Sequence, residues 1–180
     1  MTNSEKKEIH KQMLESGIGR RYLDTSQSTL GKQGEQVVER IKQGEMQDAI
    51  EAGAGITFYG ADSYDFAVLT MRSLLLADLT VQVVTLAGLA RSLDNWEFAE
   101  KLAGQDCLLV TKFCDDGMKE NPLSGYQRFQ LEDLLQDRFD DGKPVFIQTT
   151  HKLETYKDWW SPNVINQLKQ RNDVMEIKKL

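Results

Sequence analysis

The chain has 180 residues, of which 40% are hydrophobic and 28% charged, so it can bury the core of one compact domain. Its formal net charge of −6 argues against a surface built throughout for nucleic acid, although a local basic groove is compatible with it. The polar start, MTNSEKKEIHKQM, has no signal-peptide core, and no apolar run approaches the roughly 18 residues that span a membrane. We therefore expect a cytoplasmic protein without membrane contact.

Metal and redox chemistry have few candidate residues. The chain has two histidines and two cysteines, and the cysteines, Cys107 and Cys114, are spaced unlike a redox pair or a zinc knuckle. We expect free thiols that fill space, with no metal site and no cofactor.

The first part of the chain predicts helices. Residues 1–16 form an expected amphipathic helix, which ends at glycines 17 and 19. It could dock in the groove of a partner or pack on its own core. An irregular segment follows over 17–31, and then a helix over 35–43 and a short helical piece over 46–51. These residues predict an N-terminal helix, 1–16, ahead of one domain that covers 17–180.

From residue 56 onward, apolar β-branched runs alternate with helical patterns, which is typical of parallel α/β proteins. The expected strands cover 56–59, 81–86, 106–113 and 144–150, with a further short apolar run at 174–177. The expected helices cover 64–77, 88–102, 126–139 and 162–172, the second of them either whole or broken near Asp94 and Asn95. The sequence thus predicts a three-layer α/β fold around a parallel sheet of four to five strands.

Two stretches resemble one family. GIGRRYLDTS, residues 17–26, is similar to a Gly-Ile-x-x-Arg-Tyr segment, and residues 124–153, SGYQRFQLEDLLQDRFDDGKPVFIQTTHKL, are similar to a helix that leads into a sensor-1 strand. Both patterns are those of the DnaC/IstB-like AAA+ helicase loaders. The resemblance covers about 17–180 and implies a P-loop NTPase, AAA+-like core. The alternative is a doubly wound sheet of another family.

The family's Walker A loop falls on GADSYDFA when the sequences are aligned at Gly60. Phe66 then stands in place of the lysine and Ala67 in place of the hydroxyl residue that binds magnesium. Asp62 and Asp65 would place negative charge beside a phosphate. The resemblance therefore implies a degenerate nucleotide loop.

The other catalytic positions of the family also differ. Thr111 and Lys112 occupy the places of the two Walker B acids, Thr150 or His151 that of the sensor-1 residue, and Gln167 that of the arginine finger. The resemblance thus implies a pseudo-ATPase that is no longer an enzyme. A weaker alternative is an enzyme of unrelated chemistry on a Rossmann-like sheet.

Lys112 follows a central strand at its carboxyl end, where open α/β sheets bind ligands. Two roles are open for its ammonium group. It could form an internal salt bridge with Asp62 or Asp65, which is the interpretation we favour, or it could contact a ligand.

Members of this family bind single-stranded DNA. Their DNA-contacting segment corresponds to residues 85–102 of this chain, TLAGLARSLDNWEFAEKL. Arg91, Trp96 and Lys101 are the resulting DNA-binding candidates, because DNA needs cations and stacking aromatics. The alternative is that the aromatic residues of this stretch belong to the core.

A second aromatic stretch, YKDWWSPN, supplies three more DNA-binding candidates: Lys157, Trp159 and Trp160. One of the adjacent tryptophans should be partly exposed and could stack on a base or anchor a protein partner. The alternative is a hydrophobic staple for the next helix, with Ser161 as its cap and Pro162 at its first position.

The function implied is a non-catalytic, AAA+-derived protein of DNA replication or transcription. It would bind single-stranded DNA, a replication partner such as a helicase, loader or polymerase, or both. The alternative is a pure protein-interaction module that inhibits a helicase or its loader without binding DNA. A phage or mobile element is the expected source, by analogy only.

Overall fold

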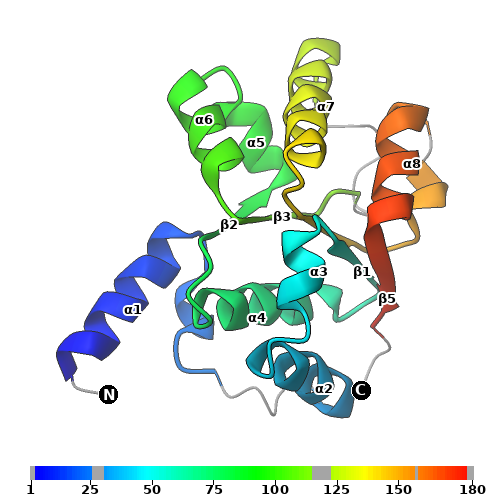
Figure 1. Ribbon diagram of the computed structural model, residues 1–180. Helices are drawn as coiled ribbons and strands as arrows, with labels where there is room; N and C mark the ends of the chain where they lie inside the picture. The colour runs from blue at the N-terminus through cyan, green and yellow to red at the C-terminus, as the bar shows by residue number, and fades with distance from the viewer. Residues whose placement is uncertain (1–2, 26–30, 115–122, 157, 178–180) are drawn as a thin grey trace.

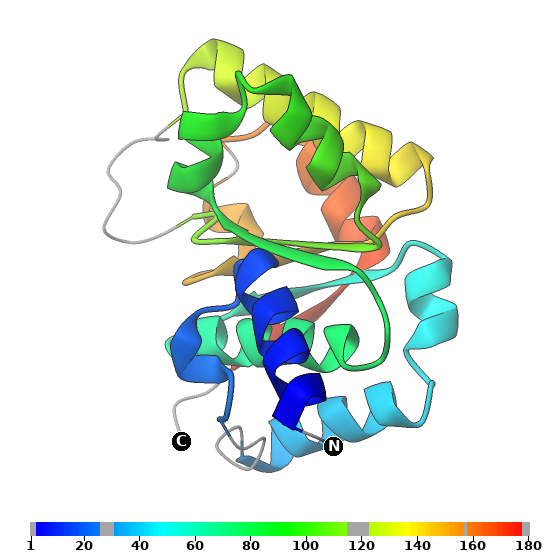
Figure 2. The same ribbon diagram turned by 90° about the vertical axis from the view of Figure 1, so that its left-hand side faces the viewer.

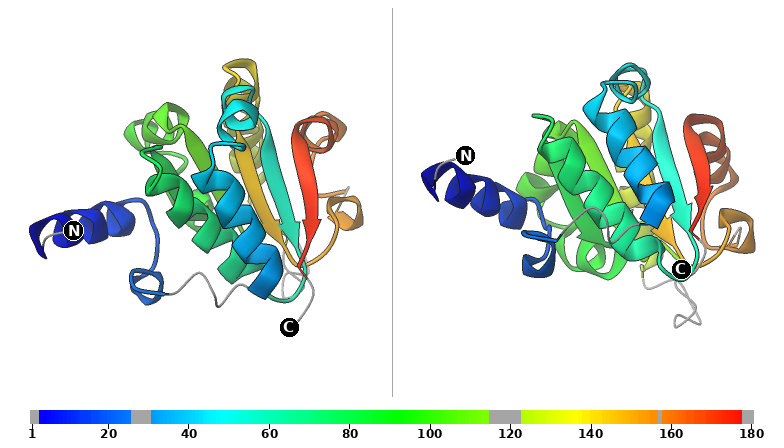
Figure 3. Two further views of the ribbon diagram at one scale, coloured as in Figure 1. Left: turned by 60° about the horizontal axis from the view of Figure 1, so that its bottom comes forward. Right: turned by 90° about the horizontal axis from the view of Figure 1, so that it is seen from below.

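Five parallel strands form one sheet in the order β2-β3-β4-β1-β5. The computed structural model describes residues 3–25, 31–114, 123–156 and 158–177. The strands are β1 Gly55–Tyr59, β2 Val81–Thr85, β3 Cys107–Thr111, β4 Val145–Thr149 and β5 Asn172–Glu176. Their arrows run the same way in Figure 3. The predicted parallel sheet of four to five strands is confirmed.

Helices cover both faces of the sheet. They are α1 Asn3–Glu15, α2 Gly31–Lys42, α3 Gln47–Glu51, α4 Ser63–Leu75, α5 Leu86–Ser92, α6 Trp96–Gly104, α7 Gly125–Asp140 and α8 Pro162–Arg171, with 3₁₀ turns η1 Arg20–Tyr22 and η3 Leu153–Tyr156. Figures 1 and 2 place α2 and α4 on one side of the sheet and α5, α6 and α7 on the other. This arrangement is the predicted three-layer fold.

The strand β3 shows why its sequence is apolar throughout. Cys107 and Leu109 pack in the hydrophobic cluster that contains α2 and α4, and Leu108 and Val110 pack in the cluster beneath α5 to α8. Successive side chains of a strand point to opposite faces, so a strand covered on both sides has no polar face.

Local capping sets where the helices of the second layer begin. The side chain of Asn95 accepts from the amides of Glu97 and Phe98, which starts α6 and breaks the predicted helix 88–102 into α5 and α6. Ser161 caps α8 with Pro162 in its first turn, as the sequence predicts.

The N-terminal segment closes one edge of the sheet. Met13 of α1 is buried in the core, so this helix packs on its own domain. After α1 the chain turns at Gly17, where φ is +81°, and the amide of Val83 in the edge strand β2 donates to the carbonyl of Ser16 at 2.8 Å. Figure 3 shows α1 extending away from the sheet beyond this contact. None of the described helices combines the length and apolarity that crossing a membrane requires.

Candidate functional site

The candidate site lies where β1, β3 and β4 end and α4 begins, at the carboxyl edge of the sheet. Only three residues, Gly60 to Asp62, connect β1 to α4. Gly60 has φ of +114°, and a Cβ there would lie 2.3 Å from the carbonyl oxygen of Ile177. This glycine is therefore required by a left-handed backbone and by close approach to the chain that follows β5.

The structure places Phe66 and Ala67 within α4 and not in a loop. Both are buried, and the Phe66 ring lies 5.7 Å from that of Phe58 in β1. The predicted helix over 64–77 is thus confirmed with a start one residue earlier, and the last five residues of the stretch aligned with the Walker A loop belong to it. The apolar character of Phe66 and Ala67 is explained by core packing.

A polar bridge connects the ends of β3, β4 and α4. The backbone amide of Lys112 donates to Gln148 Oε1, and Gln148 Nε2 donates to Ser63 Oγ, both at 2.9 Å. The Ser63 hydroxyl lies 2.7 Å from the carbonyl oxygen of Gly60 and 3.1 Å from that of Thr149. We call Lys112 N–H, Gln148 and Ser63 the Gln148 bridge. It ties the side chain of the first residue of α4 to the ends of β3 and β4.

The salt bridge expected between Lys112 and Asp62 or Asp65 is not formed. Lys112 is exposed and adopts a left-handed backbone with φ of +52°. The carboxylate of Asp65 instead lies 2.5 Å from Arg21 Nη2 and accepts from the hydroxyl of Tyr22 at 2.5 Å. The partner of Asp65 is therefore Arg21, 44 positions earlier in the chain, and not Lys112.

The segment over residues 17–25, which we call the lead-in segment, is fixed on α4 at two places. Arg21 and Tyr22 meet Asp65 in the first turn, and the Arg21 guanidinium also lies over the Tyr22 ring at 4.6 Å. Two turns further on, Arg72 donates to the carbonyls of Thr25 and Leu23 at 2.7 and 3.1 Å. Burial raises the pKa of the Tyr22 phenol, which keeps it a neutral donor.

The other positions of the implied catalytic machinery have internal partners. Thr111 is buried and donates to the carbonyl of Val84 at 3.1 Å. The Thr150 hydroxyl lies 3.3 Å from that of Tyr156. Gln167 donates to Gln136 of α7 at 3.4 Å. Each of these side chains thus bonds within the domain.

The second group of DNA candidates is split by burial. Trp160 is only 3% exposed, is stacked on Phe113 at 4.2 Å and donates to Cys114 Sγ at 3.4 Å. Its assignment as a DNA contact is therefore wrong. Trp159 is half-buried, edge-on to Tyr156 at 5.3 Å, which agrees with the expectation of one partly exposed tryptophan. Lys157 lies outside the described residues.

The first group of DNA candidates does not form one surface. Arg91 is exposed at the end of α5 and donates to the carbonyl of Ala87 in its own helix. Trp96, 69% exposed, lines a hollow between α6 and α7. Lys101 lines a different hollow beside α1 and β2, together with Glu15 and Asp78. The candidate cations and the aromatic residue are thus distributed over separate places.

Two features of this region are not predicted from the sequence. Arg21 and Tyr22 belong to the family pattern in residues 17–26 but have no predicted partner, and Gln148 has no predicted role. The sequence signal for the contact with Asp65 is the motif Arg-Arg-Tyr, which precedes a helix with an acidic first turn. No local signal marks Gln148, since the two partners of its side chain, Lys112 and Ser63, lie 36 and 85 positions away in the chain.

The strand order β2-β3-β4-β1-β5, with helices on both faces, defines a P-loop, AAA+-like α/β fold. No family model matches the sequence, and no curated protein is similar to it in sequence.

Solved structures of replication proteins share this fold. The DnaC helicase loader is 18% identical, with a TM-score of 0.70 over 89% of this chain and 100% of that one. DnaI is 12% identical, with a TM-score of 0.69 over 91% and 93% of the two chains. The replication initiator DnaA, in complex with AMPPCP and single-stranded DNA, is 11% identical, with a TM-score of 0.65 over 90% of this chain and 51% of that one. The fold is thus that of AAA+ proteins of DNA replication initiation and helicase loading.

Proposed function

We propose that this protein is a non-hydrolysing, AAA+-derived protein of DNA replication that acts by binding a protein of the replication machinery, such as a helicase or a helicase loader. The Gln148 bridge is the observation that carries the proposal. Hydrogen bonds within the chain join the first residue of α4 to the ends of β3 and β4, at the edge of the sheet where a P-loop would hold phosphates.

The dimensions of the β1–α4 connection support the loss of nucleotide chemistry. A P-loop of the pattern G-x-x-x-x-G-K-[ST] needs a long glycine-rich turn so that successive amides can surround the phosphates. Here three residues reach Ser63, and the first of them packs on Ile177. Thr111, the last residue of β3, and Lys112, which follows it, supply no carboxylate for magnesium.

The distribution of aromatic residues favours a protein partner over DNA. Trp160 is a core residue, and Trp96 shares its hollow with four carboxylates. Carboxylates repel phosphates, whereas an exposed tryptophan in a hollow is a typical anchor for a protein contact.

Single-stranded DNA is the second candidate ligand. Exposed cations, Lys112 and Lys152, flank the carboxyl edge of the sheet, and DnaA of the same fold has been seen with single-stranded DNA. Such a contact would depend on salt and tolerate many sequences.

Three measurements on the purified full chain test the proposal. Calorimetry with Mg-ATP should show no saturable binding, and a labelled oligothymidine should show weak binding that added salt abolishes. Affinity capture with the source organism's purified replicative helicase and loader should recover at least one of them. If neither the helicase nor the loader is captured and oligothymidine binds tightly, the protein partner is refuted and single-stranded DNA is the ligand.

A further inference from the structure

The groove between α6 and α7 combines a hollow, an exposed aromatic side chain and charge of one sign. Its volume is about 370 Å³. Figures 1 and 2 show the two helices side by side on the face of the sheet opposite α4. We call it the α6–α7 groove. None of the proposed catalytic or DNA positions except Trp96 belongs to it.

The charge of the groove is acidic. Asp94, Glu100, Asp133 and Asp137 line it, and no lysine or arginine is among the residues that do. Within the described part of the chain, no ion pair involves any of these four carboxylates. No cluster of three or more potential metal ligands was found there either, so the acids are spread along the groove and not gathered round one cation.

The apolar surface of the groove is open to solvent at Trp96. Trp96 lines it and is 69% exposed, while Ala99 and Leu134 supply small and buried apolar walls. Phe129, one turn before Asp133 on α7, is 66% exposed. A large exposed aromatic side chain beside a hollow is typical of an interaction surface.

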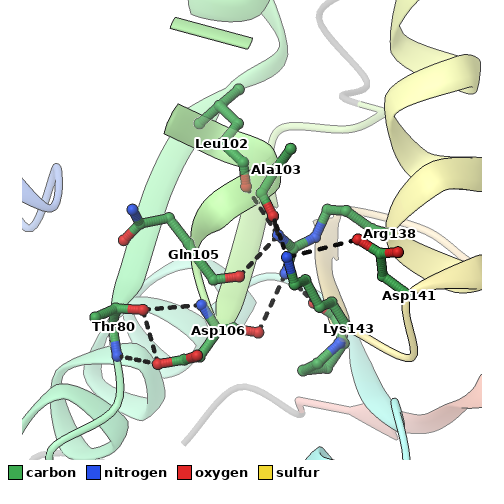
Figure 4. Close-up of polar contacts among 9 residues, drawn as sticks. Thr80, Leu102, Ala103, Gln105, Asp106, Arg138, Asp141 and Lys143 are labelled. Carbon is green, nitrogen blue, oxygen red and sulfur yellow. Dashed lines mark hydrogen bonds and ion pairs between the residues drawn. The ribbon is translucent and has the colours of Figure 1, made fainter. Parts of the chain in front are cut away.

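The groove is held in shape at one end before any partner arrives. Arg138 of α7 is 1% exposed and donates from Nη1 to the carbonyls of Leu102 and Gln105, at 2.8 and 2.9 Å. Lys143 Nζ donates to the carbonyl of Ala103, a groove residue, at 2.8 Å. Figure 4 shows both side chains reaching the end of α6. A preorganised groove loses less entropy when it binds.

We propose that the α6–α7 groove binds a basic amphipathic helix of the protein partner, with the partner's apolar face over Trp96 and its lysines or arginines beside the four acids. The inference rests on the proposed function for the kind of partner. A helix suits a trough between two helices. Four carboxylates of one sign select a basic segment and oppose both DNA and an acidic one.

A synthetic peptide tests the groove without knowledge of the partner. The probe is a fluorescein-labelled helix of about 18 residues, made of leucine and lysine with the leucines on one face. A peptide of the same composition in scrambled order is its control. Anisotropy should show tighter binding of the amphipathic peptide. Asp133→Lys with Asp137→Lys should weaken that binding at least about tenfold, and Trp96→Ala should weaken it also.

The matched control variant is Asp48→Lys with Glu51→Lys, two exposed acids on α3 that lie outside the groove. It changes net charge equally and should leave binding of the peptide almost unaltered. Equal loss in both double variants would mean that only net charge attracts the peptide, and would overturn the proposal. So would self-association that the groove variant abolishes, because a second copy would then be the occupant.

The same variants separate the groove from the proposed function. Capture of a helicase or loader by the wild-type chain but not by the groove variant supports both. Equal capture by both refutes the groove and leaves the function in place. Peptide binding that depends on the groove, without capture of any replication protein, supports the groove and refutes the function.

Discussion

The backbone amide of Lys112 donates to the side chain of Gln148 at 2.9 Å, so the residue that leaves β3 is held by the strand beside it. Lys112 adopts φ of +52° to do so, a conformation that costs a non-glycine residue energy. Gln148 is buried, and its side chain also donates to the hydroxyl of Ser63. Hydrogen bonds through Gln148 thereby link the end of β3 to the start of α4.

Replacing Gln148 should show the contribution of these hydrogen bonds. Gln148→Leu keeps the volume but leaves the Lys112 amide and the Ser63 hydroxyl without this partner, so we expect a loss of about 1–3 kcal/mol in the free energy of unfolding. Urea denaturation measures it. The control is Gln43→Leu, at an exposed glutamine directly after α2, which should change stability little. Equal effects of the two variants would contradict a structural role for the bridge.

Asp65 should be coupled to Arg21 and not to Lys112. We expect Asp65→Asn and Arg21→Met each to lower stability by about 1 kcal/mol or less, because the pair is largely exposed. A double-mutant cycle should give a positive coupling between them. Lys112→Met should leave the unfolding midpoint unchanged, as should Asp62→Asn. Coupling of Asp65 to Lys112 would refute the contacts described for the lead-in segment.

Mg-ATP should not stabilise the protein. The short connection at Gly60–Asp62 leaves no turn for the phosphates, so we expect binding weaker than about 1 mM, equivalent to roughly 4 kcal/mol. Calorimetry and a thermal shift titration measure it, with a nucleotide-binding AAA+ protein as the positive control. A saturable shift at micromolar ATP would exclude the pseudo-ATPase proposal.

Removing Arg138 should be among the costliest single changes in the chain. Its guanidinium also donates from Nη2 to the carbonyls of Asp106 and Pro144, at 3.2 and 2.9 Å, and burial lowers its pKa to about 10, so it is still charged at neutral pH. Arg138→Met should cost about 3–5 kcal/mol, since it leaves these buried carbonyls without their donor. Arg128→Met, at an exposed arginine on the same helix, should cost less than about 0.5 kcal/mol.

The two buried thiols should make the fold sensitive to alkali. Burial raises the pKa of Cys107 and of Cys114 to about 12, against an ordinary value of 9.0. Above pH 9 the unfolded chain releases thiol protons that the folded chain retains, so stability should fall as pH rises from 9 towards 12. Unfolding midpoints measured between pH 8 and pH 10 test the direction. Replacing both cysteines by alanine should reduce the slope, and an unchanged slope would contradict its assignment to the thiols.

The sequence predicts the sheet well because strand signals are local. The apolar run before Thr111 and the β-branched run that ends at Thr85 both lie where expected. The break of the helix after α5 is also local, since Asn95 supplies the cap from within two or three residues. Periodicity and capping are properties of neighbouring residues, so a single sequence contains them.

The contacts of the candidate site could not be predicted in the same way. Whether Trp96 or Trp160 is exposed depends on what packs against each, and Phe113 lies 47 positions before the tryptophan it covers. The partner of Asp65 depends on where the lead-in segment crosses α4. The neighbouring sequence does not distinguish these residues, because their burial and their partners depend on tertiary contacts between distant parts of the chain.

The contact between Ser16 and Val83 limits how far the N-terminus can be truncated for laboratory work. β2 is a terminal strand of the sheet, and the turn after α1 occupies part of its free hydrogen-bonding side. Deleting α1 with its turn would uncover that row of amides and carbonyls, which are a template for pairing with another chain. A truncated protein should therefore be prone to aggregate through its sheets, and the turn at Ser16 and Gly17 protects the edge strand against that outcome.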